Sequence, residues 1–501
     1  MNTKLLSPLV TRFLLVIMLC LPVWGNQVSA QTPESYAVLD ETTGTLTFKH
    51  DTKKPAGAYK LNEGKNVPGW FAEGETQGVN KNKIKKIVFD MSFAEARPTS
   101  CSWWFFGCNE LTVIDGIENL KTENVMTMHY MFFGCSKLTT LNISNFNTRN
   151  VTEMEGMFWG CSKLTTLDLS NFDTKNVTDM DAMFCECDNL TTLNLSNFDT
   201  KNVTYMGSMF AGCKNLTELN ISNFDTRNVT IMGAMFAGCK NLTELNISNF
   251  DTKNVTNMYS MFIECSNLAT LNLSNFDTRN VTDMEQMFWG CRKLKTLNIS
   301  DFDTKNVTTM MNMFSGCKSL TELNLSNFDT RNVTTMGHMF FGCDKLTTVY
   351  GIENFKTENV TNMKRMFNYC RNFAILNLSN FDTRNVTNME SMFHECDNLA
   401  TIYVSNKFVT TACQSSENMF KGCKKLVGAV SYDDSKTNME MANYTTGYFT
   451  DIKTTGIDAT PISDNIAAKY YDVQGRRMDA PQKGINIVKR GGRTMMKVLM
   501  K

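Results

Sequence analysis

The stretch from residue 171 to residue 196 reads NFDTKNVTDMDAMFCECDNLTTLNLS, and close copies of it fill most of the 501-residue chain. The copies share a cysteine, and nine of the twelve intervals between successive cysteines are 26 residues while three are 27. A period between 20 and 50 residues indicates a solenoid, a propeller or another array of stacked units. The cysteines in register are Cys108, Cys135, Cys161, Cys187, Cys213, Cys239, Cys265, Cys291, Cys317, Cys343, Cys370, Cys396 and Cys423.

Leucines near the end of each unit identify the kind of array. The spacing Leu164-x-x-Leu167-x-Leu169 is typical of the strand in a leucine-rich repeat, in which the leucines face inward and the intervening Asp168 faces outward. The apolar residues of the following segment recur at steps of three and four, which predicts one or two helical turns. They are Val177, Met180, Met183, Phe184 and Cys187. We therefore predict a leucine-rich-repeat-like α/β solenoid, with one short parallel strand on the concave side and one short helical segment on the convex side of each unit.

A single unit cannot bury its two flat sides, so the units must stack and the stack needs an end piece at both ends. The sequence predicts an N-terminal region and cap over 31–83, with a hairpin at Thr43–Gly44, and a solenoid over 84–432. The solenoid is expected to begin with a strand at Ile84-x-x-Ile87-x-Phe89 and to close with a strand over 426–432, which gives about 14 strands at ~4.8 Å spacing. Residues 433–454 are predicted to be a linker, and 455–501 a small β-rich module.

The N-terminus is typical of a secretion signal. Lys4 and Arg12 precede a short apolar run that ends at Trp24, and Val28-Ser29-Ala30 offers small residues for cleavage. We predict a signal peptide over 1–30, cleaved between Ala30 and Gln31. Lipid attachment at Cys20 is the alternative, which the bulky residue before it disfavours. No other stretch is long and apolar enough to predict a membrane-spanning helix in the mature chain.

The C-terminal segment departs from the repeat from residue 455 onward. Alternating stretches at 469–473, 484–488 and 497–501 are separated by glycine-containing turns, which predicts short strands. The segment YYDVQGRRM…PQKGINIVKRGG…KVLMK resembles the C-terminal modules of exported Bacteroidetes proteins, including sorting signals of type IX secretion. The resemblance implies contact with the export machinery; a plain β-rich cap is the alternative.

The overall charge disfavours some classes of partner. The chain has 50 basic and 50 acidic residues, so no basic field is present to gather nucleic acid, and we expect no nucleic-acid partner. Histidine occurs four times, at His50, His129, His338 and His394, and no hydrolase, zinc-protease or phosphate-loop motif occurs. We therefore expect neither an enzyme nor a cofactor or metal.

The repeat itself resembles a known family. The string F-D-T-[KR]-N-V-T-x-M-x-x-M-F-x-G-C, within a match from Ile84 to about Tyr432, resembles the BspA-like bacterial surface proteins with 26-residue leucine-rich-type repeats. The resemblance implies an exported protein of the outer surface of a Bacteroidetes-like bacterium. It also implies adhesion to host proteins and other cells, and no enzymatic activity.

The cysteine column is expected to be a stack of buried thiols rather than a metal or redox ladder, because free cysteine packs as a small hydrophobe. The cysteines off this column are the expected oxidisable ones, and Cys101 with Cys108 is a candidate disulfide. In the chain after the predicted signal peptide, these are Cys101, Cys185 and Cys413. The methionines, two in each unit, are expected to fill the core rather than to bind copper.

Two further positions invite predictions. Four units have Glu186, Glu264, Tyr369 or Glu395 where the others have glycine before the cysteine, so we expect that this position does not require a positive φ. The aspartate of N-F-D-T, such as Asp173, is expected to form ion pairs between units or Asx turns rather than a calcium ladder.

The predicted binding face consists of the outward residues of the strands. It is a long, polar, repeat-built surface for extended ligands such as host proteins, proteins of neighbouring cells or glycans. Its residues are Thr166, Asp168, Thr192, Asn194, Glu218, Asn220, Glu244, Asn246, Thr270, Asn272, Thr296 and Asn298. A second candidate surface is an aromatic edge at Trp159 and Trp289. The leading hypothesis is an exported adhesion protein; a structural spacer without a specific ligand is the alternative, and a glycan-active enzyme comes third.

Overall fold

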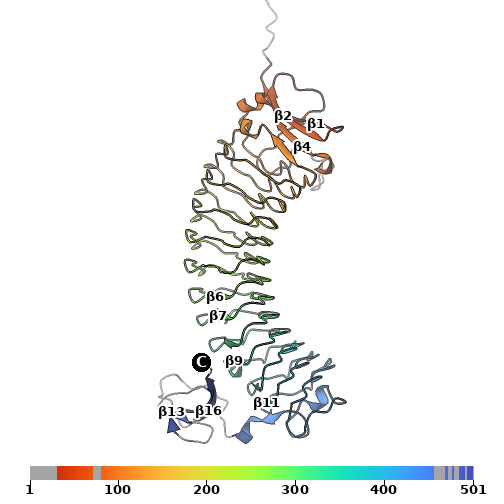
Figure 1. The fold of residues 1–501 in the computed structure, drawn as a ribbon, viewed down its shortest axis with the longest axis vertical. Helices are drawn as coiled ribbons and strands as arrows, with labels where there is room; N and C mark the ends of the chain where they lie inside the picture. The colour runs from red at the N-terminus through yellow and green to blue at the C-terminus, as the bar shows by residue number, and fades with distance from the viewer. Residues whose placement is uncertain are drawn as a thin grey trace, which may run out of the picture.

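The computed structural model is an elongated, curved stack of repeats with a folded region at each end (Figure 1). It describes residues 31–70 and 81–455, together with four strands near the C-terminus. The predicted signal peptide, with Ala30 and Cys20, lies outside the described residues, while Gln31 is described and exposed. No helix in the described part of the chain is long and apolar enough to cross a membrane.

The N-terminal cap is a small sheet that continues directly into the repeats. Strands β1 (Glu34–Asp40) and β2 (Thr45–Asp51) form an antiparallel hairpin whose turn contains Gly44 at φ 71°. The sheet order is β3-β1-β2-β4-β5, with β3 at Tyr59–Lys60, β4 at Lys86–Phe89 and β5 at Val113–Asp115. Two 3₁₀ turns, η1 (Lys81–Lys83) and η2 (Met91–Glu95), flank β4. The predicted hairpin and first solenoid strand are confirmed.

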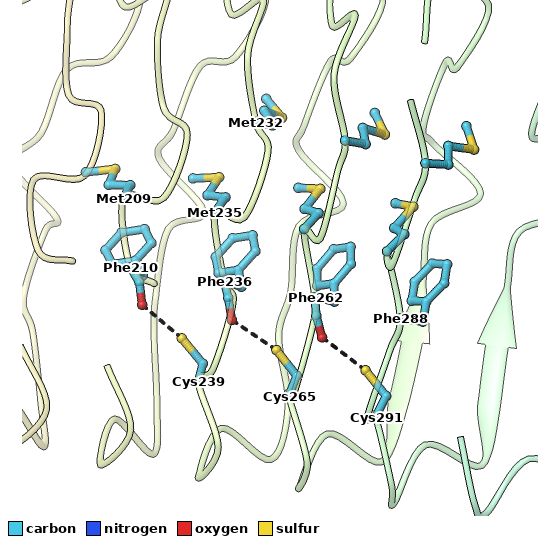
Figure 2. Packing of buried hydrophobic residues seen from close by; sticks show 14 of the residues in the cluster. Met209, Phe210, Met232, Met235, Phe236, Cys239, Phe262, Cys265, Phe288 and Cys291 are labelled. Carbon is cyan, nitrogen blue, oxygen red and sulfur yellow. Dashed lines mark hydrogen bonds between the residues drawn. The ribbon is translucent and has the colours of Figure 1, made fainter. Parts of the chain in front are cut away.

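The core of the stack is made of columns of identical side chains. Val177, Met180, Met183, Phe184 and Cys187 are all completely buried, as are their counterparts in the neighbouring units. Figure 2 shows the methionine, phenylalanine and cysteine columns side by side. Equivalent phenylalanines stack face to face, with centroids 5.9 Å apart and rings inclined by 9° between Phe184 and Phe210. Each unit therefore covers the inward face of the next one.

The strand edge of the stack is less regular than predicted. Parallel pairs form between β6 (Thr270–Asn272) and β7 (Thr296–Asn298), and between β8 (Glu322–Asn324) and β9 (Thr348–Tyr350). Strand β10 (Ile375–Asn377) pairs with β11 (Thr401–Val404). No strand is assigned to the equivalent segments of the units between residues 138 and 246. The leucine-rich-repeat-like solenoid is confirmed, but it has fewer strands than the 14 expected.

The predicted helical segment of each unit is wrong. Residues 177–187 form consecutive turns, in which Met183 N–H bonds to the Met180 carbonyl at 3.3 Å while Phe184 N–H bonds to Met209 of the next unit at 2.9 Å. The apolar spacing misled the prediction because successive turns, like a helix, bring every third or fourth residue inward. In the repeats, 3₁₀ turns occur only at η3 (Ile117–Asn119) and η4 (Ile352–Asn354), in units that carry an extra residue.

These turns build a second, continuous ladder. Four N–H groups of one unit, those of Met154, Gly156, Phe158 and Gly160, donate to carbonyls of the next unit over 2.7 to 3.0 Å. Single-residue parallel bridges link this edge without interruption from Ser100 to Ser415. The turn edge, rather than the strand edge, therefore holds neighbouring units at hydrogen-bonding distance along the whole stack.

The two edges differ in spacing, and this difference curves the stack. Near the turn edge, the rings of Phe236 and Phe262 are 5.6 Å apart, whereas Phe250 and Phe276, which follow the strand segment, are 6.4 Å apart. A stack that is wider along one edge bends toward the other, so the strand edge lies on the outer side of the curve in Figure 1. The predicted placement of the strands on the concave side is therefore wrong.

Each end of the turn ladder leaves backbone groups without a neighbouring unit, and the caps supply their partners. At the N-terminal end, Asn62 Nδ2 donates to the Ser102 carbonyl and Trp70 Nε1 to the Trp104 carbonyl, each over 2.9 Å. These side chains replace the N–H groups that a preceding unit would offer. A buried carbonyl without such a donor would cost about 1–3 kcal/mol.

At the C-terminal end the missing partners are acceptors. Asn418 N–H bonds to Asn438 Oδ1 at 3.0 Å, Phe420 N–H to the Thr437 carbonyl at 2.9 Å, and Gly422 N–H to the Tyr432 hydroxyl at 3.0 Å. The segment that supplies most of them was predicted to be a linker but is folded onto the last repeat. It contains η5 (Met439–Met441), β12 (Thr450–Asp451) and η6 (Ile452–Thr455).

The closing strand is β12, which pairs in parallel with β11. The prediction of a closing strand over 426–432 is wrong, because this stretch forms a turn with an antiparallel bridge between Val427 and Ser431. Beyond the cap, β13 (Lys469–Tyr471), β14 (Arg477–Met478), β15 (Gly484–Arg490) and β16 (Arg493–Leu499) form an antiparallel sheet in the order β14-β13-β15-β16. The expected C-terminal strands are present, and the role of this module in sorting stays a prediction.

The position before the column cysteine does require a positive φ, contrary to our expectation. Gly212 and Gly238 have φ values of 74° and 69°, and the non-glycine residues Glu186 and Glu264 adopt 56° and 55°. Tyr369 and Glu395 do the same. The turn ladder imposes this conformation on every unit, and an L-residue with a side chain bears a cost of roughly 1–2 kcal/mol for it.

Replacing Glu186 by glycine is therefore expected to raise the free energy of unfolding by about 1 kcal/mol, because glycine adopts this conformation without strain. Equilibrium denaturation of the two proteins measures the difference. Glu186→Val, which adds a β-branched side chain at the same place, is the control and should lower stability. A destabilised glycine variant would show that the Glu186 side chain contributes more than the strain costs.

Candidate functional site

The outward residues of the strand edge, which we call the strand face, lie in columns as predicted. Thr270 pairs in register with Thr296, and Asn272 with Asn298, whose Nδ2 donates to Asn272 Oδ1 over 3.0 Å. All residues of the predicted binding face are exposed except Asn298, which is half-buried. The strand face therefore exists as a continuous polar surface, on the outer side of the curve.

The asparagine column of the strand face also has a structural role. Asn194 Oδ1 accepts a hydrogen bond from Ser196 N–H at 3.1 Å, and Asn220 Oδ1 from Ser222 N–H at 3.2 Å. Each such bond fixes the turn that leaves the strand segment. The near-uniformity of this column is thus explained by folding as well as by any binding.

A second surface, the turn face, consists of four positions in each turn segment. They are represented by Tyr205, which is exposed, Gly207, which is buried, and Ser208 and Ala211, which are half-buried. Backbone hydrogen bonds and buried methionines hold these turns, so the four side chains are free to differ between units. They do differ: the equivalents are Glu153, Glu155, Gly156 and Trp159 two units earlier, and Asp283, Glu285, Gln286 and Trp289 three units later. The turn face combines an invariant frame with variable side chains.

The predicted aromatic edge belongs to the turn face, but its two tryptophans are in different surroundings. Trp159 is half-buried and packs edge-on against Phe133, with centroids 5.1 Å apart. Trp289 is 39% exposed. The intervening units have Cys185, Ala211, Ala237 and Ile263 at this position, and these residues help to line a shallow recess of about 360 Å³. The two tryptophans are thus separated by a recess and do not form one continuous edge.

The turn face of the units around Trp159 is acidic. Glu155 accepts hydrogen bonds from the Tyr130 hydroxyl at 2.7 Å and pairs with His129 at 3.1 Å, and these contacts lower its pKa. Burial, and then the negative charges of Asp179 and Glu155, raise the pKa of Asp181 to about 6. Burial also raises the pKa of Asp179. These carboxylates repel one another at neutral pH.

The other candidate sites are explained by packing. Asp173 pairs with Lys175 of its own unit at 2.8 Å and accepts a hydrogen bond from Lys175 N–H at 3.2 Å. The aspartates therefore form Asx turns with ion pairs inside a unit, and the expected pairs between units are wrong here. Among the described residues, no three His, Cys, Asp or Glu side chains are grouped so that they could hold a metal ion. The histidines lie apart, and His50 contacts the Ser35 hydroxyl at 2.9 Å.

The cysteines of the described chain are all free. In the column after Cys108, each thiol donates to a phenylalanine carbonyl of the preceding unit, as Cys265 does to Phe236 over 3.1 Å (Figure 2). The candidate disulfide between Cys101 and Cys108 is wrong, because both are buried free thiols. Cys101 and Cys185 are also too buried to be the oxidisable cysteines expected, whereas Cys413 is partly exposed.

Cys413 is expected to react with a thiol reagent in the native protein far faster than the column cysteines. Burial raises the pKa of column thiols such as Cys187 well above its usual range, and the reactive form is the thiolate. Labelling followed by peptide mapping measures the modified sites, with denatured protein as the control in which every thiol reacts. Labelling of the column cysteines in native protein would contradict the burial of these thiols in the core.

Sequence reasoning missed most of the turn face. It identified Trp159 and Trp289 but not Asp179, Asp181 or Tyr205. The available signal was variation between units: at these four positions the units differ in size and charge, while the core and strand positions hardly change. A comparison of the units with one another would have separated these positions from the constant frame.

Comparisons with known proteins give a family and several similar structures. The sequence profile described as "Mycoplasma protein of unknown function, DUF285" matches residues 99–217, 185–271, 264–350 and 344–454. No curated protein matches the chain. A leucine-rich repeat protein from Bacteroides ovatus is 17% identical, with a TM-score of 0.49, over 84% of this chain and 98% of that one.

Two further similar structures are also bacterial. A leucine-rich repeat protein from Eubacterium ventriosum is 16% identical, with a TM-score of 0.36, over 78% of this chain and 95% of that one. A leucine rich cell surface protein from Faecalibacterium prausnitzii is 16% identical, with a TM-score of 0.29, over 75% and 96%.

Proposed function

The chain belongs to the DUF285 family, and we propose that it is an exported cell-surface protein that binds other macromolecules, as an adhesin does. The observation that supports this most is the turn face. Its backbone turns and its apolar core recur from unit to unit, while the side chains at its four positions change. Such a surface presents different contacts along an extended partner, and it suits recognition better than a reaction at one centre.

The proposed partners are proteins of a host or of neighbouring cells, or glycans, and the proposed location is the outside of the bacterium. The predicted signal peptide and the β-rich segment after residue 455 support export. The strand face is a second candidate contact surface, since its columns are exposed and polar. A spacer without a ligand is the alternative function; the caps at both ends, which occupy the free ladder groups, give no support to end-to-end assembly.

A binding screen tests the proposed function. The exported full-length protein is applied to immobilised extracellular-matrix proteins and to a glycan array, and we expect saturable binding to at least one of them. Immobilised serum albumin serves as the control, because binding to it would indicate non-specific adhesion. Absence of saturable binding together with ordered self-assembly in electron micrographs would favour the spacer instead.

Mass spectrometry of the exported chain is expected to find Gln31 as its first residue. The physical reason is the charged start, the apolar run and the small residues before the cleavage point. A chain that retains Met1 serves as the unprocessed reference. A mature chain that begins at a lipid-modified Cys20 would contradict this prediction and would indicate a membrane-anchored lipoprotein.

A further inference from the structure

The middle of the turn face has a distinctive charge. We define the central turn face as the turn-face positions of the six units from Glu153 to Trp289. It contains six carboxylates and no lysine or arginine. The carboxylates are Glu153, Glu155, Asp179, Asp181, Asp283 and Glu285. The whole chain is neutral, so this is a local excess of negative charge on one face rather than a property of the composition.

Four of these six carboxylates have no basic partner among the described residues, namely Asp179, Asp181, Asp283 and Glu285. Glu153 pairs with Lys65 at 3.0 Å and Glu155 with His129 at 3.1 Å. Among the described residues, no comparable ion pair involves Asp179 or Asp181. Burial raises the pKa values of both, and the negative charges of neighbouring carboxylates add to this effect. A positive charge placed beside them would offset that repulsion.

Exposed aromatic side chains are concentrated on the same surface. Between Glu153 and Asn418, the large apolar side chains that are exposed in the described chain are Tyr205, Tyr259 and Trp289, at 47%, 39% and 39%. All three belong to the central turn face. Exposed tyrosine and tryptophan are typical of interfaces, and their rings attract cations and the carbon chains of lysine and arginine.

Two glycines lie between the acidic and the aromatic residues. In the column that contains Asp181 and Tyr259, the two intervening residues are Gly207 and Gly233. A Cβ atom on Gly207 would lie 2.5 Å from Asp181 Oδ1, and one on Gly233 would lie 2.8 Å from Asn257 Oδ1. Glycine at position 207 therefore leaves room for the Asp181 carboxylate, which lies against it.

We propose that the central turn face binds an extended polypeptide segment rich in lysine and arginine, with Asp179 and Asp181 facing its cations and Tyr205, Tyr259 and Trp289 contacting its side chains. This inference rests on the proposed binding function and specifies the partner. Six units at about 5 Å spacing extend over roughly 25 Å, which matches about seven residues of extended chain. The charge complementarity favours a basic peptide over a neutral glycan, whose hydroxyl groups would leave the carboxylate charges uncompensated.

The test uses the full chain and a fluorescent oligolysine peptide of about eight residues, with binding followed by anisotropy. The double variant Asp179→Asn/Asp181→Asn keeps the side-chain shapes and is expected to lose affinity by about tenfold, since it removes two attractive charges near the surface. The matched control, Glu95→Gln/Glu118→Gln, removes the same charge from two exposed positions outside both candidate surfaces and should change affinity less than twofold. Thermal melts check that both variants are folded.

Salt and pH provide independent readouts. Binding should weaken as salt is added, because exposed charges are screened. It should also weaken from about pH 7.5 to pH 5, since Asp181, with a pKa of about 6, is neutral below that value and charged above it. The control variant should show the same pH dependence as the native chain, and the double variant a smaller one.

Three results would overturn the proposal. The first is equal affinity loss in the two variants, which would mean that oligolysine binds to negative charge anywhere. The second is binding of a neutral oligosaccharide that Tyr259→Ser abolishes, without oligolysine binding, which would assign the surface to glycans. The third is undiminished binding of a matrix protein to the Asp179→Asn/Asp181→Asn variant. That last result would leave the proposed function intact and move the contact surface to another face.

Discussion

Replacing Phe236 by alanine lowers the free energy of unfolding by about 3–5 kcal/mol, the usual cost of removing a buried aromatic ring. Phe236 is completely buried, and its ring stacks between those of Phe210 and Phe262 at 5.9 and 5.6 Å. The cavity would lie in the middle of the stack, where the units on both sides depend on it for their packing. Denaturant unfolding followed by circular dichroism measures the loss.

Tyr205→Ala is the matched control for this prediction, because it removes an aromatic ring from a neighbouring unit at an exposed position. Its cost should stay within about 0.5 kcal/mol, as for most surface substitutions. Because units contact only their neighbours, Phe236→Ala is also expected to broaden the transition or to divide it in two. Equal losses in the two variants would contradict the assignment of inward and outward positions.

Replacing Trp70 by alanine is expected to have a similarly large effect, of about 4 kcal/mol or more. Trp70 is completely buried, its ring lies edge-on to Phe48 at 5.3 Å, and its Nε1 donates to the Trp104 carbonyl. The substitution removes the buried ring and leaves a ladder carbonyl of the first unit without a donor, and the two costs add. Thermal unfolding measures the change.

Trp289→Ala, an exposed tryptophan in the repeats, serves as the control and should change stability little. Proteolysis gives a second readout: in the Trp70→Ala protein, cleavage should begin in the first units rather than in the middle of the stack. Cleavage at the same sites and rates as in the native protein would show that the N-terminal cap does not close the ladder.

The inward half of the fold followed directly from the sequence. Leu164, Met180 and Phe184 recur at fixed spacing, and a residue that recurs as an apolar type in every unit has to face the shared core. The strand segment was predicted for the same reason. The hairpin at Gly44 was predicted from local turn chemistry, which needs no knowledge of the stack.

The turn ladder could not be predicted because its hydrogen bonds join different units. A spacing of three and four residues fits both a helix and successive turns, and the choice between them depends on whether Phe184 N–H bonds within its unit or to Met209. The positive φ values could not be predicted for the same reason. A positive φ is unfavourable for Glu186 when the residue is considered alone, and the hydrogen bonds to the next unit impose it. The roles of Asn62 and Asn438 in the caps could not be predicted either, because neither residue belongs to the repeat.

The candidate site was only partly accessible from sequence for a different reason. Repetition draws attention to what is constant, and the strand face with Asn194 and Asn220 is constant. The turn face differs between units, so Asp181 and Tyr259 looked like departures from the consensus without functional meaning. Their proximity depends on the ladder that brings equivalent positions of successive units together.

The direction of the turn ladder gives the stack an electrical polarity. The N–H groups of the turn ladder all point toward the C-terminal end, and fewer N–H groups, such as that of Thr178, point back toward the preceding unit. The peptide dipoles of the turn ladder therefore add along the rod instead of cancelling as they do in ordinary sheets. The arrangement resembles the dipole of a helix, with partial negative charge at the carbonyl end and partial positive charge at the N–H end. An additional unit would lengthen this row of aligned peptide dipoles. It would add as many N–H donors to the ladder as carbonyl acceptors. The rod can therefore change its length by whole units while the same two caps still fit its poles.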